Sequence, residues 1–260
     1  MNKKDKKVTE VIAAYTKAIK ANPNDAVGYF KRGTAYLKRG MAYSKREDWE
    51  RAIADFTRAI EIDPKHADAY NNRGVVYCVI GDFARAIADF TRVIKIDPKY
   101  VAAYYSRGCA YRDIFEVNKA ITDFSKVIEL DPGNADVYFY RASAYAMKRD
   151  HDLAVEDYTR RLELVPDDAG TYVFRGNSYR EMSMYTRAIA DYTKAIEINP
   201  KCPTAYFQRG ITYVCDENYE EAIPDFKRAL EINPSFAEAS QRLAYAEEQL
   251  AKKKRKKREE

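Results

Sequence analysis

Apolar and small residues recur along the chain at spacings of three and four, which place side chains on one face of an α-helix. An aromatic residue, a small residue and a second aromatic share such a face at Tyr70, Gly74 and Tyr77. A second face follows at Ala86, Phe90 and Val93. Between them lies a short turn that ends in Asp82, a residue type that caps helix starts. The pattern predicts two helices joined by a tight turn.

This hairpin repeats along the chain with a fixed period. Prolines close successive hairpins at positions 23, 64, 98, 132, 166, 200 and 234. The last five gaps are 34 residues each, and the first is 41. A proline ends a helix because it pushes the preceding residue out of the α region. A constant period of this size is the signature of a repeat architecture, in which each apolar face is covered by a neighbouring repeat.

The pattern resembles the tetratricopeptide repeat (TPR), whose signature is aromatic, small, aromatic, then alanine, aromatic and proline at these spacings. The resemblance implies an all-α fold, an α-solenoid that forms a right-handed superhelix of six TPR hairpins with a half-repeat at each end. It also implies that the first helix of each hairpin lines a concave surface where peptides or partner helices bind. The six units are expected at 26–66, 67–100, 101–134, 135–168, 169–202 and 203–236.

The segments outside the six units are predicted to form the two ends of the solenoid. Residues 7–25 carry only a second helix, and residues 237–251 carry only a capping first helix. A disordered basic N-terminus is expected at 1–6 and a basic tail at 252–260.

An arginine and an aspartate recur once per hairpin, which marks an Arg-Gly/Asp-aromatic variant of the repeat. We expect structural ion pairs within each unit, at Arg73 with Asp89, Arg107 with Asp123, Arg141 with Asp157, Arg175 with Asp191 and Arg209 with Asp225. The two half-repeats carry Ala14 and Leu243 at the matching positions. Pairing within a unit therefore leaves no charged group alone.

Two units are irregular. The first contains a seven-residue duplication, at 31–36 and 38–43, which fits a helix lengthened by about two turns. Arg39 rather than Arg32 then becomes a candidate partner for Asp55, and the alternative is a bulged loop at 44–48. The sixth unit has Pro224 inside its second helix, which predicts a kink or a late helix start.

The charge of the chain is concentrated at its C-terminal end. The formal net charge is +5, but without residues 252–260 the chain has 38 basic and 38 acidic residues. The seven basic residues Lys252–Arg258 read either as cations that suit a helix C-terminus or as a nucleic-acid contact or nuclear-import signal. The sequence shows no apolar run for membrane insertion and no secretory signal. We expect a cytoplasmic protein, or a nuclear one if the chain is eukaryotic and the tail is an import signal.

No catalytic constellation is present, so we expect no enzyme, no metal site and no cofactor. His66 and His151 are the only histidines. Cys78 and Cys109 are expected on adjacent first helices, and we favour small apolar roles for both over a redox or metal site. Neither a phosphate-binding glycine loop nor a nucleophile elbow occurs.

The family resemblance directs attention to the concave face of the first helices. A peptide-binding groove is predicted to include Phe30, Asn71, Tyr105, Arg112, Phe139, Asn177, Arg180 and Phe207. The alternative for the aromatic members is burial against the next repeat. The lysine and asparagine clamp for the Hsp70/Hsp90 C-terminal tail is matched at only two of five positions, which argues against that ligand. The leading hypothesis is a non-catalytic protein–protein interaction scaffold, and the alternatives are a nucleic-acid-associated factor or an accessory subunit of an enzyme.

Overall fold

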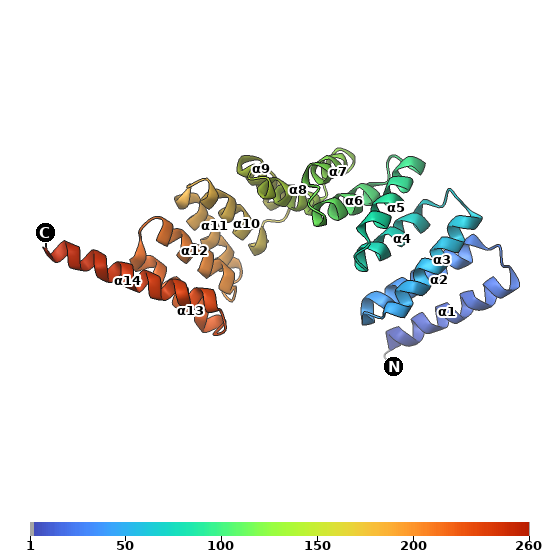
Figure 1. Cartoon of the computed structure of the whole chain (residues 1–260), viewed down its shortest axis with the longest axis horizontal. Helices are drawn as coiled ribbons and strands as arrows, with labels where there is room; N and C mark the ends of the chain where they lie inside the picture. Colours follow the sequence, from blue (N-terminus) through green and yellow to red (C-terminus); the bar gives the residue numbers. More distant parts are fainter. Residues whose placement is uncertain (1–2, 260) are drawn as a thin grey trace. The chain divides into compact units, whose positions relative to one another are not determined.

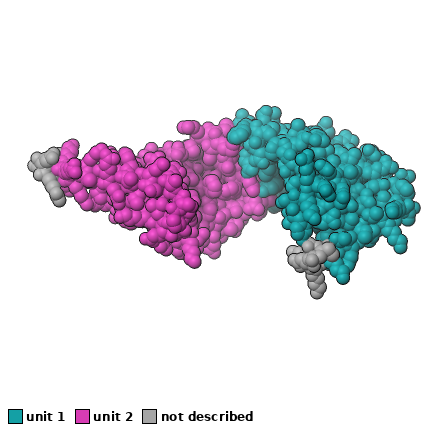
Figure 2. Space-filling view, turned by 60° about the horizontal axis from the view of Figure 1, so that its bottom comes forward, with its two compact units in different colours: residues 1–132 teal, residues 133–260 magenta. Residues whose placement is uncertain are grey.

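The computed structural model describes residues 3–259 and contains helices but no strand among them. The chain divides into two compact units, one up to Pro132 and one from Gly133 on (Figure 2). The helices of the first unit are α1 (Lys3–Ala21), α2 (Ala26–Tyr43), α3 (Arg46–Ile62), α4 (Ala67–Val79), α5 (Phe83–Ile96), α6 (Val101–Asp113) and α7 (Val117–Leu130). Those of the second unit are α8 (Ala135–Met147), α9 (His151–Leu164), α10 (Ala169–Glu181), α11 (Tyr185–Ile198), α12 (Pro203–Cys215), α13 (Tyr219–Ile232) and α14 (Ala237–Glu259).

Within each unit the helices form a solenoid of antiparallel hairpins (Figure 1). The hairpins α2/α3, α4/α5 and α6/α7 belong to the first unit, and α8/α9, α10/α11 and α12/α13 belong to the second. The all-α repeat fold predicted from the sequence is therefore confirmed. The first helices begin at residues 26, 67, 101, 135, 169 and 203, where the predicted repeats also begin.

Each hairpin is held by an aromatic ring of the second helix pressed against a small residue of the first. The ring of Phe90 lies so close to Gly74 that a Cβ atom there would be 2.7 Å from Phe90 Cε1. Gly33, Gly108, Gly176 and Gly210 meet the same ring contact in their own hairpins. Glycine is therefore retained in these helices, despite its low helix propensity, because it permits close helix approach.

The duplicated segment of the first unit is helical. α2 runs unbroken from Ala26 to Tyr43, and α3 already starts at Arg46. The alternative of a bulged loop over 44–48 is therefore wrong. Only residues 44 and 45 separate the two helices, and Ser44 takes the left-handed conformation that closes the turn.

Pro224 lies inside α13, which nevertheless starts at Tyr219. Phe83, Val117, His151 and Tyr185 start the corresponding helices at the same repeat position. The alternative of a late helix start is therefore wrong, and a kink at Pro224 stays a prediction.

The helices at both ends extend beyond the bounds predicted from the sequence. α1 starts at Lys3, inside the segment 1–6 for which we expected disorder, and residues 1 and 2 lie outside the described part. α14 continues through the predicted basic tail to Glu259, and residue 260 lies outside the described part. No helix in the described residues is long and apolar enough to cross a bilayer.

Candidate functional site

An aromatic cluster lies on the first helices of the second unit. The ring of Phe139 on α8 meets the ring of Phe174 on α10 edge to face, with centroids 5.1 Å apart. It also lies 5.7 Å from the rings of Tyr140 and Tyr158. Tyr158 on α9 is 1% exposed, whereas Phe174 is 45% exposed. The cluster therefore runs from the core of its hairpin to the solvent, and Phe174 presents an aromatic surface that the fold leaves uncovered.

Arg161 of α9 contacts this cluster at Phe139. The other five hairpins have an apolar residue at the position of Arg161. The equivalent residues are buried and small or β-branched: Ala59, Val93, Val127, Ala195 and Ala229. The guanidinium carbon of Arg161 lies 5.3 Å from the centroid of Phe139. Because a cation over an aromatic face is attracted by the ring, this contact helps to orient Phe139.

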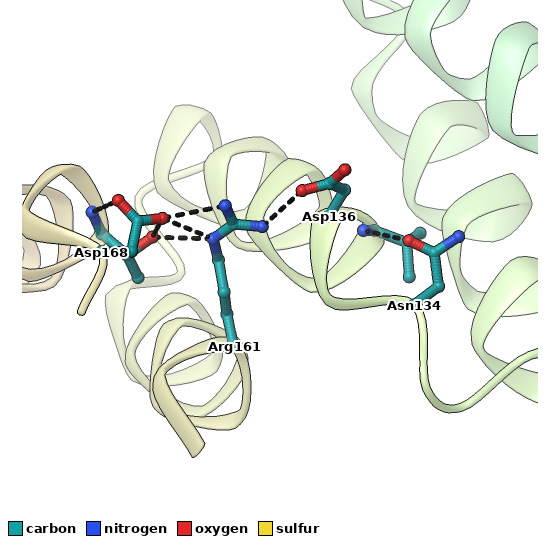
Figure 3. Close-up of polar contacts among 6 residues, drawn as sticks. Asn134, Asp136, Arg161 and Asp168 are labelled. Carbon is teal, nitrogen blue, oxygen red and sulfur yellow. Dashed lines mark hydrogen bonds and ion pairs between the residues drawn. The ribbon is translucent and has the colours of Figure 1, made fainter. Parts of the chain in front are cut away.

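The same guanidinium joins three helices (Figure 3). Arg161 Nη1 donates to Asp136 Oδ1 of α8 at 2.7 Å, and Nε donates to Asp168 Oδ2 at 2.9 Å. Asp168 also caps α10 by accepting a hydrogen bond from the Thr171 amide at 3.3 Å. The network thereby fixes the start of α10, the helix that carries Phe174.

The contacts between Arg161 and its carboxylate partners shift the pKa values of Arg161 and Asp168. Burial raises the pKa of Asp168, but hydrogen bonds from Thr171 and Arg161 outweigh it and leave that pKa below its ordinary value. Burial lowers the pKa of Arg161, while the bonds to Asp136 and Asp168 leave it above its ordinary value. Both groups therefore stay charged at neutral pH.

Polar groups extend the aromatic surface along α10. Asn177 and Arg180 follow Phe174 at intervals of three residues, so the three occupy one side of the helix. Asn177 Oδ1 accepts a hydrogen bond from the Tyr192 hydroxyl at 2.9 Å, and burial raises the pKa of Tyr192 to about 12. Arg180 donates to Gln208 of α12, and its Nη2 lies 3.3 Å from Glu181. These contacts hold an amide and a guanidinium at the partly exposed surface.

The predicted groove residues of the first unit are also half-buried. Phe30 packs between Phe56 and His66, with centroid distances of 6.0 and 4.7 Å. Tyr105 lies 6.3 Å from Phe124. The side chains of Phe30 and Tyr105 therefore contribute to hairpin packing.

The polar groove residues predicted in the first unit are Asn71 on α4 and Arg112 on α6. Asn71 Oδ1 is buried and has no hydrogen-bond partner among the described residues. Arg112 Nη2 forms an ion pair with Asp113 Oδ1 at 2.7 Å.

Phe207 differs from the prediction. It is only 5% exposed and packs against Phe226 at 5.9 Å and Phe236 at 4.7 Å. Phe236, in the turn before α14, covers the ring that the sequence pattern assigned to the groove. Phe207 is therefore a core residue of the last hairpin, as the alternative of burial against the next repeat required.

The arginine and aspartate side chains of each hairpin meet in bidentate pairs. Nε and Nη2 of each arginine contact the two carboxylate oxygens at 2.7–2.8 Å. The pairs are Arg73–Asp89, Arg107–Asp123, Arg141–Asp157, Arg175–Asp191 and Arg209–Asp225. Hydrogen bonds to the aspartate raise the pKa of Arg107, Arg175 and Arg209, against burial, which lowers it.

A threonine completes this arrangement and was missed in the sequence. Nη1 of the arginine donates to a threonine on the second helix of the preceding repeat, at 2.9–3.2 Å: Arg32 to Thr16, Arg73 to Thr57, Arg107 to Thr91, Arg175 to Thr159 and Arg209 to Thr193. The sequence did contain a pattern that could have predicted this contact, because each of these threonines directly follows the aromatic residue of its second helix. Where the next first helix carries Leu243 instead of arginine, the position holds Lys227.

The first hairpin has two such pairs. Arg32 pairs with Asp55 and Arg39 pairs with Asp48, each at 2.7 Å. The expectation that Arg39 takes Asp55 is therefore wrong. The two arginines are seven residues apart, as are the two aspartates. The duplication therefore adds a second Arg–Asp ion pair to the first hairpin.

Cys78 and Cys109 are partly buried, and His66 makes a local hydrogen bond. Burial raises the pKa of both Cys78 and Cys109 to about 11, which keeps the thiols protonated at neutral pH. His66 accepts a hydrogen bond from the Ala69 amide at 3.4 Å and so caps α4. No group of three potential metal ligands occurs in the part of the chain that the structure describes.

Comparison with known proteins agrees with the repeat geometry. Models described as tetratricopeptide repeat match residues 37–101, 101–134 and 203–236, and a further one matches 14–54 and 124–156. A TPR repeat model matches residues 176–214. The chain belongs to the tetratricopeptide repeat family. No curated protein matches this TPR chain.

Several solved structures resemble the chain. The crystal structure of MamA is 32% identical with a TM-score of 0.60, and the alignment covers 64% of this chain and 96% of MamA. YrrB, described as a TPR protein with an unusual peptide-binding site, is 24% identical with a TM-score of 0.63, covering 72% of this chain and 96% of YrrB. The C-terminal part of a TPR protein from Cytophaga hutchinsonii is 18% identical with a TM-score of 0.76, covering 92% of this chain and 96% of that one. The last two show the fold alone.

Proposed function

We propose that this TPR chain is a non-catalytic scaffold that binds a peptide or helix of a partner protein on its first helices. The fold supports protein interaction in general. The observation that carries the specific proposal is Phe174, an exposed aromatic residue held in place by Phe139 and the Arg161 network. A hairpin does not need this residue for its own packing, since four of the other five hairpins carry a polar residue or a lysine at the equivalent position.

The chemistry of the surface defines the ligand class. Phe174 and Tyr140 offer apolar area, and Arg180 offers a guanidinium that forms paired hydrogen bonds with carboxylates. Asn177 adds an amide with both donor and acceptor capacity. A matching peptide carries an apolar anchor followed by an acidic residue. The similarity to YrrB, which is described as having an unusual peptide-binding site, supports a peptide as the ligand class.

A peptide library displayed on phage and panned against the whole chain tests this proposal. Selected peptides should combine apolar and acidic residues. Their affinity should fall about tenfold or more with F174A or R180A, because the buried contact or the charge-assisted bond is lost. F115A is the matched control, because Phe115 is 79% exposed but lies in the turn between α6 and α7. Peptides that bind all four proteins equally, or a panning that enriches none, would contradict the proposal.

The basic segment of α14 supports a second candidate, a nucleic-acid-associated factor. Lys252–Lys257 are exposed on a continuous helix. Contacts with the chain include Lys252–Glu248, Lys254–Glu220 and Lys253 with the Glu217 carbonyl. If the segment neutralises phosphates, RNA or DNA binding should weaken steeply with salt and vanish when residues 252–260 are deleted. Salt-independent binding, or binding that survives the deletion, would reject this candidate.

A further inference from the structure

The helix α1 has the residue pattern of a second helix, and the described residues contain no first helix for its hairpin. In the six complete hairpins, the alanine and the aromatic residue of the second helix are buried by the first helix. The alanines are Ala52, Ala86, Ala120, Ala154, Ala188 and Ala222, and the aromatics are Phe56, Phe90, Phe124, Tyr158, Tyr192 and Phe226. None of these side chains is more than 1% exposed.

The equivalent residues of α1 are Val11 and Tyr15, and both are only half-buried. Together with Val8 they form one wall of a groove of about 360 Å³, whose other wall is α2. No helix among the described residues covers this groove. It lies on the face of α1 against which a first helix packs in every complete hairpin.

The rim of the groove is positively charged. Lys7 of α1 and Lys31 and Lys38 of α2 line it, and no aspartate or glutamate does. Lys31 lies over the ring of Phe30, 5.8 Å from its centroid, and none of the three ammonium groups has an ion pair among the described residues. Three cations that form no ion pair among the described side chains, around an apolar floor, favour an occupant that brings acidic side chains.

We propose that this groove binds an acidic amphipathic helix of a partner protein, which completes the N-terminal hairpin. The helix needs a small residue opposite Tyr15, as Ala142 stands opposite Tyr158 in the fourth hairpin. It needs no arginine, because Ala14 occupies the place of the hairpin aspartate. The site is separate from the Phe174 surface and does not depend on it.

A second copy of the chain fits this groove less well than an acidic helix, because of its charge. Its α14 is the one first helix in the described chain without a second helix, and it has small Ala244 at the required position. Antiparallel packing on α1 would, however, bring Lys252–Lys257 beside Lys6 and Lys7. Like charges at an interface oppose association, so the lysines select against self-assembly and in favour of an acidic partner.

A designed pair of fluorescent peptides tests this proposal with the full-length chain. Each is a short helix with an aromatic, a small residue four positions later and an aromatic three beyond, as in the first helices here. One carries glutamates on its polar face and the other carries lysines. By fluorescence anisotropy, the glutamate peptide should bind at least tenfold more tightly than the lysine peptide. It should lose about tenfold or more in affinity for the K31E/K38E variant.

The control variant K65E/K99E changes the net charge equally at exposed lysines outside the groove, and its affinity should stay within about twofold of the original. Circular dichroism should show that both variants remain folded, since all four lysines are exposed. Equal affinity for both peptides, or no effect of K31E/K38E, would overturn the proposal. Binding lost with F174A but kept with K31E/K38E would overturn it too and place the peptide on the other surface. Dimers that dissociate with K31E/K38E in sedimentation would assign the groove to a second copy instead.

Discussion

At the residue scale, five arginines, Arg32, Arg73, Arg107, Arg175 and Arg209, each connect three helices. Arg73 on α4 binds Asp89 on α5 through two hydrogen bonds and Thr57 on α3 through a third. Its exposed fraction is small, so both charges of the pair are largely removed from water. Such pairs gain little net stability over apolar packing, but leaving one partner alone is costly. We therefore assign these arginines to fixing the register of neighbouring repeats.

A double-mutant cycle on this pair tests that role. D89A leaves the guanidinium of Arg73 without its buried partner and should lower the unfolding free energy by about 3–5 kcal/mol. R73A should cost a similar amount, while the double variant should cost much less than the sum of the two. Urea denaturation of the four proteins measures the coupling. Additive single effects would show that the two side chains act independently.

The pair Arg39–Asp48 makes stability depend on pH. Asp48 is 2% exposed, and the hydrogen bonds from Arg39 hold the pKa of its carboxyl below the ordinary value. Its ionised form therefore stabilises the folded state above the unfolded pKa of about 3.9. That contribution is lost as the pH falls through the lower, folded pKa.

The unfolding free energy of the chain should consequently decline below about pH 4, and D48N should flatten that decline. Denaturant titrations between about pH 2 and 6 measure both curves. D167N, a change at an exposed aspartate of the loop before α10, is the control. If D48N and D167N give the same pH profile as the unchanged chain, Asp48 does not carry the effect.

At the element scale, the helix pattern was readable because proline, glycine and aromatic positions recur at a fixed period. The duplication in α2 was recognisable as two helical turns for the same reason. Arg161 was not predicted, because its role depends on Asp136, Asp168 and Phe139, which only packing brings together. The burial of Phe207 likewise depends on Phe236, a residue of the following turn.

Pro224 gives a direct test of helix energetics. It lies in the interior of α13 on an exposed face, where its ring removes one backbone hydrogen bond. P224A should raise the unfolding free energy by about 1–3 kcal/mol, since proline costs about 3 kcal/mol in a helix interior. The reverse change A190P, at the equivalent exposed position of α11, should lower it by a similar amount. Thermal and urea unfolding measure both, and a P224A chain no more stable than the original would contradict this reading.

At the scale of the whole molecule, each unit combines invariant hairpin packing with a few positions that depart from it. The departures are the informative ones. Phe174 is an exposed aromatic at a position occupied mostly by polar residues, and α1 has a half-buried apolar face beside α2 that no further helix of the described chain covers. The sequence could locate the first helices. It could not tell which of their side chains are exposed, because exposure depends on packing against the neighbouring repeat. We propose that both are contact surfaces for helical or extended segments of partner proteins.

The most direct measurement is photo-crosslinking of a phage-selected peptide to the chain. p-Benzoylphenylalanine is placed at position 174 in one protein and at position 115 in another, both exposed phenylalanine sites. A covalent adduct is expected from position 174, strongly reduced by R180A, and none from position 115. Adducts from position 115 alone, or equal adducts from both, would contradict the claim that the first helices of this TPR chain carry the recognition surface.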